Sequence, residues 1–233
     1  MRVLITGAAG AVGSVLTQGL RGRHRLRGLD RLPMPDLDDA VVGDLADFAV
    51  VLRAAQGMEA IIHLGGTPSG SAPWEEVLHS NIVGTYNVFE AARHSGVRRV
   101  AFASRAGLLS SYPKAVTRTV DLPPRPESLY SVGKVFGESL GYMYAVRFGL
   151  EVVAVRIGNF RRDRDRPEHP HQLSHTDAVQ VFAQAILHPG VRFEVVFGVS
   201  DSDWPLYDLD HGRRVLGYYP QDRSTVPLEA RDQ

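Results

Sequence analysis

The fold is decided by the stretch Thr6-Gly7-Ala8-Ala9-Gly10-Ala11-Val12-Gly13. An apolar run over residues 3–5 precedes it and a segment of helical period follows it, so it should join a buried strand to a helix. Glycines at these positions permit a tight turn, a close approach of backbone to a pyrophosphate and close packing of helix on strand. The free N–H groups that begin the helix then face the phosphates. We expect a dinucleotide to contact Gly7, Ala9, Gly10, Ala11, Val12 and Gly13.

Beyond this stretch, short apolar runs alternate with longer segments of helical period. Several runs are continuously apolar, as buried parallel strands are. The runs span residues 3–6, 26–29, 41–42, 60–64, 100–104, 152–157 and 193–197. Their alternation predicts an α/β fold, a Rossmann-type doubly wound parallel sheet with helices on both faces. The pattern weakens after residue 157, so we expect a dinucleotide-binding domain over 1–158 and a small substrate-binding extension of it over 159–233.

Charge and composition narrow the classes of partner. The 26 basic and 26 acidic side chains balance, which leaves no large field of one sign to attract nucleic acid or a membrane. There is no cysteine, so disulfides and thiolate metal sites are excluded. His169, His171 and His175 lack an identifiable carboxylate frame, and we expect no metal. The chain shows neither a signal peptide nor the ~18 apolar residues of a membrane span, so we expect a cytoplasmic protein with a small-molecule substrate.

An acidic residue at the end of the second predicted strand bears on the choice of dinucleotide. Asp30 lies seventeen residues after Gly13, where a carboxylate accepts hydrogen bonds from the adenosine ribose hydroxyls and repels a 2′-phosphate. Arg31 beside it argues the other way, because an arginine can accommodate that phosphate. The carboxylate occupies the ribose position itself, so the sequence favours NAD over NADP.

Four further segments follow the glycine loop in a characteristic order: Gly43-Asp44-Leu45, His63-Leu64-Gly65-Gly66, Asn81-Ile82-Val83-Gly84-Thr85-Tyr86-Asn87 and Tyr130-Ser131-Val132-Gly133-Lys134. With that loop they resemble the extended short-chain dehydrogenase/reductase family, also called the NAD-dependent epimerase/dehydratase family. The resemblance implies that Asp44 and Leu45 meet the adenine. It also implies that residues 64–66 pass under the middle of the cofactor, that Asn81 is structural and that Ile157 lies at the cofactor.

Other phrases resemble the uronate dehydrogenases within that family, which oxidise the anomeric carbon of a hexuronic acid with NAD. These phrases are Phe102-Ala103-Ser104, Tyr112-Pro113, Arg125-Pro126, Val155-Arg156-Ile157-Gly158 and Ser174-His175. The resemblance further implies a homodimer or higher homo-oligomer, formed by packing of the helices that carry Asn81 and Tyr130.

Tyr130 and Lys134 are the candidate catalytic pair. Their spacing of four places both side chains on one face of a helix. An ammonium near a phenol favours the phenolate, which lowers a tyrosine pKa toward the working pH. Tyr130 can then take a hydroxyl proton while a hydride leaves for the nicotinamide. The resemblance adds that Lys134 holds the nicotinamide ribose.

The family places a catalytic serine or threonine after the strand that ends here in Phe102-Ala103-Ser104-Arg105. Alignment on Phe102 puts Arg105 at that position, and a shift of one residue turns a strand side chain to the other face. Ser104 is our first candidate for the catalytic serine, and a β-bulge would be needed to direct its side chain toward the site. Ser110 and Ser111 lie further along the loop after this strand. Arg105 is alternatively a substrate or anion binder, because its planar fork suits carboxylate or phosphate.

The substrate side departs furthest from the uronate dehydrogenases. There a serine follows the Arg-Ile-Gly phrase and an arginine shortly after it holds the substrate carboxylate. Here Asn159 takes the first position and Pro167 the second, with Arg162, Arg164 and Arg166 as unaligned candidates. Thr67 and Ser69 are hydroxyl donors expected to line the substrate side.

Three functions compete on these observations. The first is an NAD-dependent oxidoreductase acting on a sugar or sugar-acid hydroxyl. The second is a nucleotide-sugar epimerase or dehydratase, although few residues after 157 remain to hold a nucleotide. The third is a catalytically weakened NAD-binding sensor or interaction protein, which the substitution at Arg105 keeps open.

Overall fold

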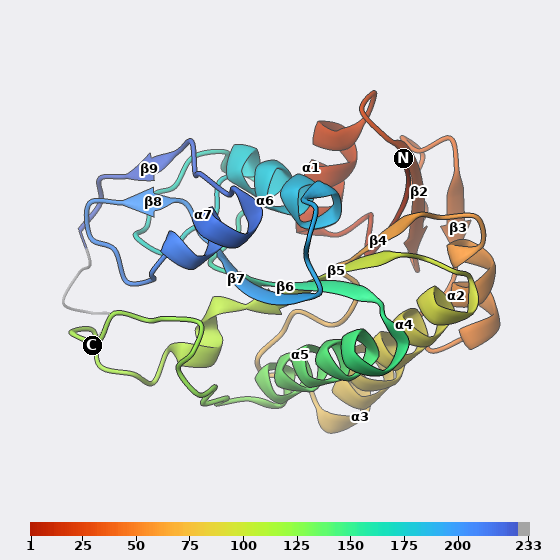
Figure 1. Cartoon of the computed structure of the whole chain (residues 1–233), viewed down its shortest axis with the longest axis horizontal. Helices are drawn as coiled ribbons and strands as arrows, with labels where there is room; N and C mark the ends of the chain where they lie inside the picture. Colours follow the sequence, from red (N-terminus) through yellow and green to blue (C-terminus); the bar gives the residue numbers. More distant parts are fainter. Residues whose placement is uncertain (228–233) are drawn as a thin grey trace.

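A seven-stranded parallel sheet forms the centre of the molecule, a computed structural model that describes residues 1–227 (Figure 1). Its strands are β1 (Arg2–Thr6), β2 (Arg25–Asp30), β3 (Ala40–Val42), β4 (Ala60–His63), β5 (Arg99–Arg105), β6 (Glu151–Ile157) and β7 (Phe193–Gly198). They lie in the order β3-β2-β1-β4-β5-β6-β7, which confirms the predicted doubly wound fold. The strand order reverses between β1 and β4, so the carboxyl ends of these two strands open a crevice for a ligand.

Helices cover both faces of the sheet (Figure 1). On one face lie α1 (Ala11–Leu20) and α6 (His175–Leu187), and on the other α2 (Phe48–Ala55), α4 (Gly84–His94) and α5 (Leu129–Phe148). Each face of the sheet carries a hydrophobic core, and alternate residues of β1 pack into the two. Val3 and Ile5 pack toward α1 and α6, and Leu4 packs on the opposite face. Burial on both faces accounts for the continuous apolar runs in the sequence. No helix within residues 1–227 is long and apolar enough to cross a bilayer.

The region after residue 158 supplies β7, the last strand of the central sheet, and also forms helices and short strands outside it. β7 pairs with β6 from Val152 to Ile157, and α6 begins where Ser174 accepts a hydrogen bond from the N–H of Asp177. The sequence showed little period in the tail, yet it holds α7 (Asp210–Leu216) and the short pair β8 (Asp201–Ser202) and β9 (Arg223–Ser224).

The connection that follows β5 lies against this C-terminal part. It begins with the short 3-10 helix η2 (Ala106–Leu109), and Arg118 further along it bridges to Tyr207. A small apolar cluster joins η2 to Phe197 and Leu206. In Figure 1 the two segments lie together on the left, beyond the ends of β5 to β7.

Candidate active site

A cleft of about 850 Å³ runs across the carboxyl ends of the strands. Its wall includes most of the predicted site residues: Gly7, Gly10, Ala11, Val12, Gly13, Asp30, Arg31, Asp44, Leu45, Leu64, Gly65, Gly66, Ser104, Arg105, Tyr130, Lys134, Ile157 and Asn159. Four predicted residues, Ala9, Thr67, Ser69 and Asn81, lie outside this wall. The hydroxyl of Ser69 is exposed and lies 2.9 Å from that of Ser71.

The glycine loop is closed by backbone contacts that leave no room for side chains. Gly7 has a φ of +70°, and a Cβ there would lie 2.8 Å from the amide nitrogen of Gly65 in the loop after β4. A Cβ on Gly13 would lie 2.1 Å from the carbonyl oxygen of Gly7. The helix α1 begins after Gly10 with no side chain capping it, so its first N–H groups face the cleft end of the strand. The loop therefore offers backbone donors where a pyrophosphate can approach closely.

Asp30 ties the second strand to this loop. Its Oδ2 accepts a hydrogen bond of 3.0 Å from the N–H of Ala9, and its Oδ1 accepts one of 3.0 Å from Leu32. Ala9 thus acts through its backbone, by orienting the carboxylate that lines the cleft. A carboxylate fixed in this way can accept further bonds from ribose hydroxyls.

Asp44 is held at the far end of the cleft by a residue that the sequence did not indicate. Burial acts to raise the pKa of Asp44, but hydrogen bonds from the Ala46 N–H and the His79 ring bring that pKa below its usual value. His79 Nε2 lies 3.2 Å from Asp44 Oδ2. The carboxylate is therefore ionised at neutral pH and available to an adenine amino group.

Asn81 fixes the loop after β4 from within a π-helix, η1 (Leu78–Val83), which continues from α3 (Trp74–Val77) into α4. Its Oδ1 accepts a 2.9 Å hydrogen bond from the N–H of Thr67, and its Nδ2 donates one of 3.1 Å to the Thr67 carbonyl. Both side chains are buried. This geometry agrees with the structural role predicted for Asn81. Both the N–H and the carbonyl of Thr67 are hydrogen-bonded to the Asn81 side chain.

Tyr130 and Lys134 lie on successive turns of α5, which begins where Ser128 accepts a hydrogen bond from Ser131. The Lys134 ammonium lies 5.5 Å from the centre of the Tyr130 ring and donates a 2.7 Å hydrogen bond to the carbonyl of Ala103. Burial, followed by repulsion from Arg105, lowers the pKa of Lys134 to about 8. Burial raises the pKa of Tyr130, and the charge of Arg105 opposes that rise.

Ser104 lies on the cleft wall, but its hydroxyl is directed to a buried ion pair. The hydroxyl donates a 2.6 Å hydrogen bond to Glu138 Oε1 of α5, and Arg156 of β6 binds both oxygens of the same carboxylate. Its single proton is therefore committed to Glu138, and the strand runs regularly through this position without the bulge that would re-aim it.

Arg105, the last residue of β5, reaches Tyr130 near the start of α5. Its guanidinium carbon lies 5.2 Å from the centre of the Tyr130 ring, and its Nη1 donates a 2.9 Å hydrogen bond to Ser131 Oγ. The guanidinium lies over Gly107, where a Cβ would come within 2.3 Å of Nη2. Glycine at 107 is thus what admits an arginine beside the catalytic pair.

This arrangement has known counterparts. Residues 3–187 match the model of the NAD dependent epimerase/dehydratase family. The chain belongs to this family. It is 38% identical to uronate dehydrogenase from Pseudomonas syringae pv. tomato, covering 97% of this chain and 83% of that protein. It is 37% identical to NAD-dependent glucose-6-phosphate dehydrogenase from Haloferax volcanii, covering 95% and 94%. A mutant of uronate dehydrogenase from Agrobacterium tumefaciens complexed with NAD superposes with a TM-score of 0.89, at 34% identity, covering 98% and 91%.

The cofactor of this epimerase/dehydratase family member is NAD, and the residues present fit it. The side-chain-free cradle at Gly7 and Gly13 admits a pyrophosphate, while Asp30 suits ribose hydroxyls. When bound, NAD supplies a hydride acceptor. The residues that would hold it run from Asp44 through the glycine loop to Lys134.

Substitution of Ser104 by alanine distinguishes a structural role, hydrogen bonding to the buried Glu138 carboxylate, from a catalytic role as a donor to substrate. Because the hydroxyl serves a buried carboxylate, we expect Ser104→Ala to lower the free energy of unfolding by ~1–3 kcal/mol and kcat by less than ~10-fold. Urea unfolding and steady-state rates measure the two effects, with the exposed Ser111→Ala as control. A loss of kcat of ~100-fold at unchanged stability would instead make Ser104 a donor to substrate.

Several cleft residues escaped the sequence analysis. Lys114, Arg118, Leu206 and Tyr207 all line the wall. They belong to irregular segments separated by some ninety residues. The N–H of Arg118 donates a 2.8 Å hydrogen bond to the carbonyl of Leu206, and the N–H of Asp208 donates one of 2.9 Å to the carbonyl of Arg118. No local pattern marks such a contact.

Proposed function

We propose that the chain is an NAD-dependent oxidoreductase that oxidises a hydroxyl of a sugar or sugar acid, with Tyr130 as general base. The observation that carries this proposal is the Tyr130–Lys134 pair, which lines the same cleft as the glycine loop. Tyr130 takes the hydroxyl proton, while the hydride from the same carbon goes to the nicotinamide. The charge of Arg105 favours the phenolate that must form first, but burial has the larger effect and raises the pKa of Tyr130, contrary to the lowering by Lys134 expected from the sequence.

The substrate class is supported by the relatives and by the shape of the wall. Uronate dehydrogenase and glucose-6-phosphate dehydrogenase are named for sugars that carry an acidic group. Of the predicted substrate-side residues, Arg105 and Asn159 line the cleft beyond Tyr130. Asn159 is oriented by His171, whose Nε2 lies 3.0 Å from its amide nitrogen.

A panel of substrates tests the function. We expect reduction of NAD, followed by its absorbance, with at least one compound among uronic acids, aldoses and their phosphates. Binding of NAD without its reduction by any of them would leave the chain a cofactor-binding protein rather than an oxidoreductase. Conversion of a nucleotide sugar without net reduction of NAD would make it an epimerase.

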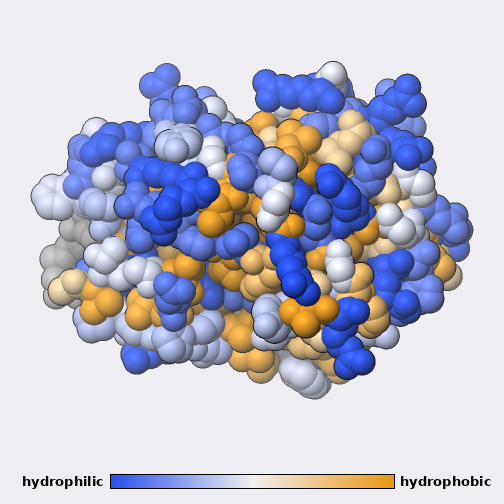
Figure 2. Space-filling view, in the orientation of Figure 1, coloured by the Kyte–Doolittle hydropathy of each residue, from blue (hydrophilic) through white to orange (hydrophobic). Residues whose placement is uncertain are grey.

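We also propose that the chain forms a homodimer through α4 and α5. Large apolar side chains are exposed along these helices, with Tyr86 47%, Val132 46%, Tyr142 56% and Val146 48% accessible. Figure 2 shows apolar surface among the charged residues at the lower side, where α5 runs. An apolar face of this kind is typical of a protein–protein contact.

The dimer is tested by mass in solution. We expect a particle of twice the chain mass for the wild type and a monomer for Tyr142→Glu combined with Val146→Glu. Leu187→Glu, at an equally exposed apolar position at the end of α6, is the matched control and should leave the mass unchanged. A monomeric wild type at micromolar concentration would contradict the proposal.

A further inference from the structure

The end of the cleft beyond Tyr130 is positively charged. Arg105 and Arg118 line it, whereas the only carboxylates among the described lining residues are Asp30 and Asp44. Those two follow β2 and β3, on the opposite side of β1 from β5. A substrate bound beside Arg105 therefore meets cationic groups with no carboxylate of the described wall to offset them.

Arg118 is buried with a donor left over. It is 4% exposed, its Nε donates to the carbonyl of Leu109 at 3.1 Å and its Nη2 to that of Tyr112 at 2.9 Å. Its buried Nη1 has no hydrogen-bond partner among the residues that the structure describes. A buried charged group with an unused N–H is costly unless a ligand accepts from it.

Arg105 presents a second guanidinium whose position is fixed. Its Nη1 is held by Ser131 and its plane lies over Gly107, while Nε and Nη2 make no hydrogen bond to a described residue. Both arginines also reach one phenol of the wall, that of Tyr207: burial raises the pKa of Tyr207, and the charges of Arg118 and Arg105 oppose the rise. The guanidinium of Arg118 lies 5.7 Å from the Tyr207 ring centre.

Resting on the proposed function, we propose that Arg105 and Arg118 form a subsite for the phosphate group of a phosphorylated sugar. Two guanidinium groups match a dianion in charge, and their planar forks match the oxygens of a phosphate. A single carboxylate would leave one of them uncompensated.

The segment after β6 does not supply this charge. Arg162, Arg164 and Arg166 do not line the cleft, and Arg164 pairs with Glu168 of its own loop. The anion is therefore bound from the end of β5 and the connection that follows it, which carry Arg105 and Arg118.

The test uses protein loaded with reduced NAD, so that a sugar can bind without being oxidised. Inorganic phosphate, glucose 6-phosphate, glucuronate and glucose are titrated while the fluorescence of the reduced cofactor is followed. We expect glucose 6-phosphate to bind at least ~10-fold more tightly than glucose, and phosphate to compete with it.

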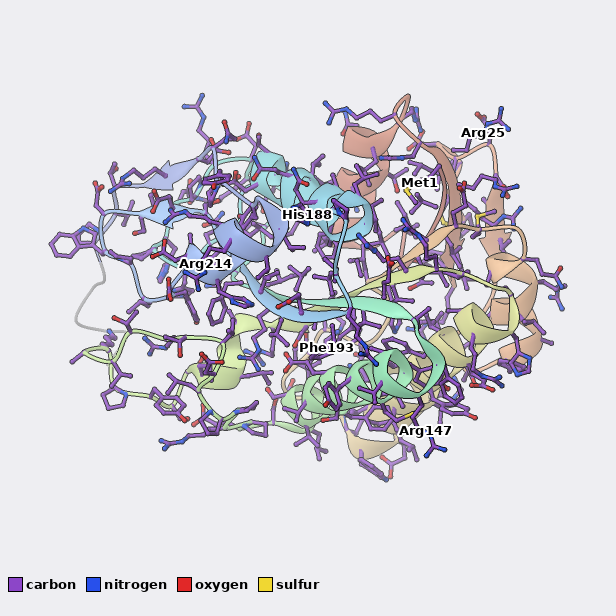
Figure 3. All side chains as sticks on the ribbon, viewed as in Figure 1. Met1, Arg25, Arg147, His188, Phe193 and Arg214 are labelled. Atoms are coloured by element: carbon purple, nitrogen blue, oxygen red, sulfur yellow. The ribbon has the colours of Figure 1, made fainter. Side chains whose placement is uncertain are left out.

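Variants locate the subsite. Arg105→Met and Arg118→Met should each weaken binding of glucose 6-phosphate by ~10-fold or more, and leave the affinity for reduced NAD unchanged. Gly107→Ala, which displaces the Arg105 guanidinium, should act in the same direction if Arg118→Met does not fold. Arg147→Met removes one charge on the outer side of α5, at the lower right of Figure 3, and should change nothing.

The outcomes are separable. Equal affinity for glucose and glucose 6-phosphate, or undiminished binding in both arginine variants, overturns the subsite even if the chain oxidises sugars. Tighter binding of glucuronate, with the same dependence on both arginines, overturns the assignment to phosphate. Phosphate-dependent binding without oxidation of any sugar refutes the proposed function and leaves the subsite standing.

Discussion

Replacing Tyr130 with phenylalanine is expected to lower kcat by ~10²–10⁴-fold while leaving the Kd for NAD nearly unchanged. The substitution removes the group that accepts the substrate proton and preserves the ring on which Arg105 and Lys134 pack. Lys134 keeps its hydrogen bond to Ala103, so the cofactor side of the cleft should be intact. Steady-state rates with saturating NAD, and titration of the free protein with NAD, measure the two quantities.

The matched control is Tyr142→Phe, which removes a phenol from an exposed position of the same helix. Its kcat should equal that of the wild type. If Tyr130→Phe retains most of the activity, the proton must pass to another group, and the assignment of Tyr130 as general base is wrong.

The second large effect is expected from Gly13→Ala. The added methyl would lie 2.1 Å from the carbonyl oxygen of Gly7 and 2.7 Å from Cα of Ala8, so α1 must move away from β1. Overpacking against backbone costs ~1–3 kcal/mol or more in stability, and the displaced helix no longer points its N–H groups at the phosphates. We expect a fall in affinity for NAD of ~100-fold or more together with a lower Tm.

Gly212→Ala provides the comparison for this variant. It adds the same methyl group within α7, where the nearest atoms lie at 3.7 Å. A helical glycine replaced by alanine without a clash should be slightly stabilised, and NAD binding should be unchanged. Wild-type affinity in Gly13→Ala would show that the pyrophosphate does not bind at this loop.

The elements that could be predicted from sequence are those that local pattern determines. The strand–glycine–helix unit at residues 3–20 was recognisable because turn geometry and packing each require a glycine at a known offset. The apolar runs predicted β1 to β7, and those of β1, β4, β5 and β6 are buried almost throughout because helices cover both faces of the sheet. The period of two along β5 predicted opposite directions for Ser104 and Arg105, but in the structure both side chains bind α5, through Glu138 and Ser131 respectively.

What escaped prediction depends on contacts between distant segments. Arg118 is held in the cleft wall by its pairing with the segment at Leu206, and His79 of η1 reaches Asp44 in the loop after β3. Thr67 was expected to line the substrate side; it lies outside the cleft wall, and its backbone is held by Asn81, which lies 14 residues away in the chain. Composition and residue spacing carry no information about contacts between segments that are distant in the chain.

The position of β7 at one edge of the sheet has a consequence for biosynthesis. During translation the first six strands emerge before β7, and Tyr207 and Leu206 emerge later still. Until then the backbone N–H and C=O groups at the edge of β6 are unpaired, and Arg118 lacks the Tyr207 segment to which it is bridged. A ribosome-bound chain can therefore assemble the nucleotide crevice early, but the substrate end of the cleft closes only after Leu206 and Tyr207 have emerged.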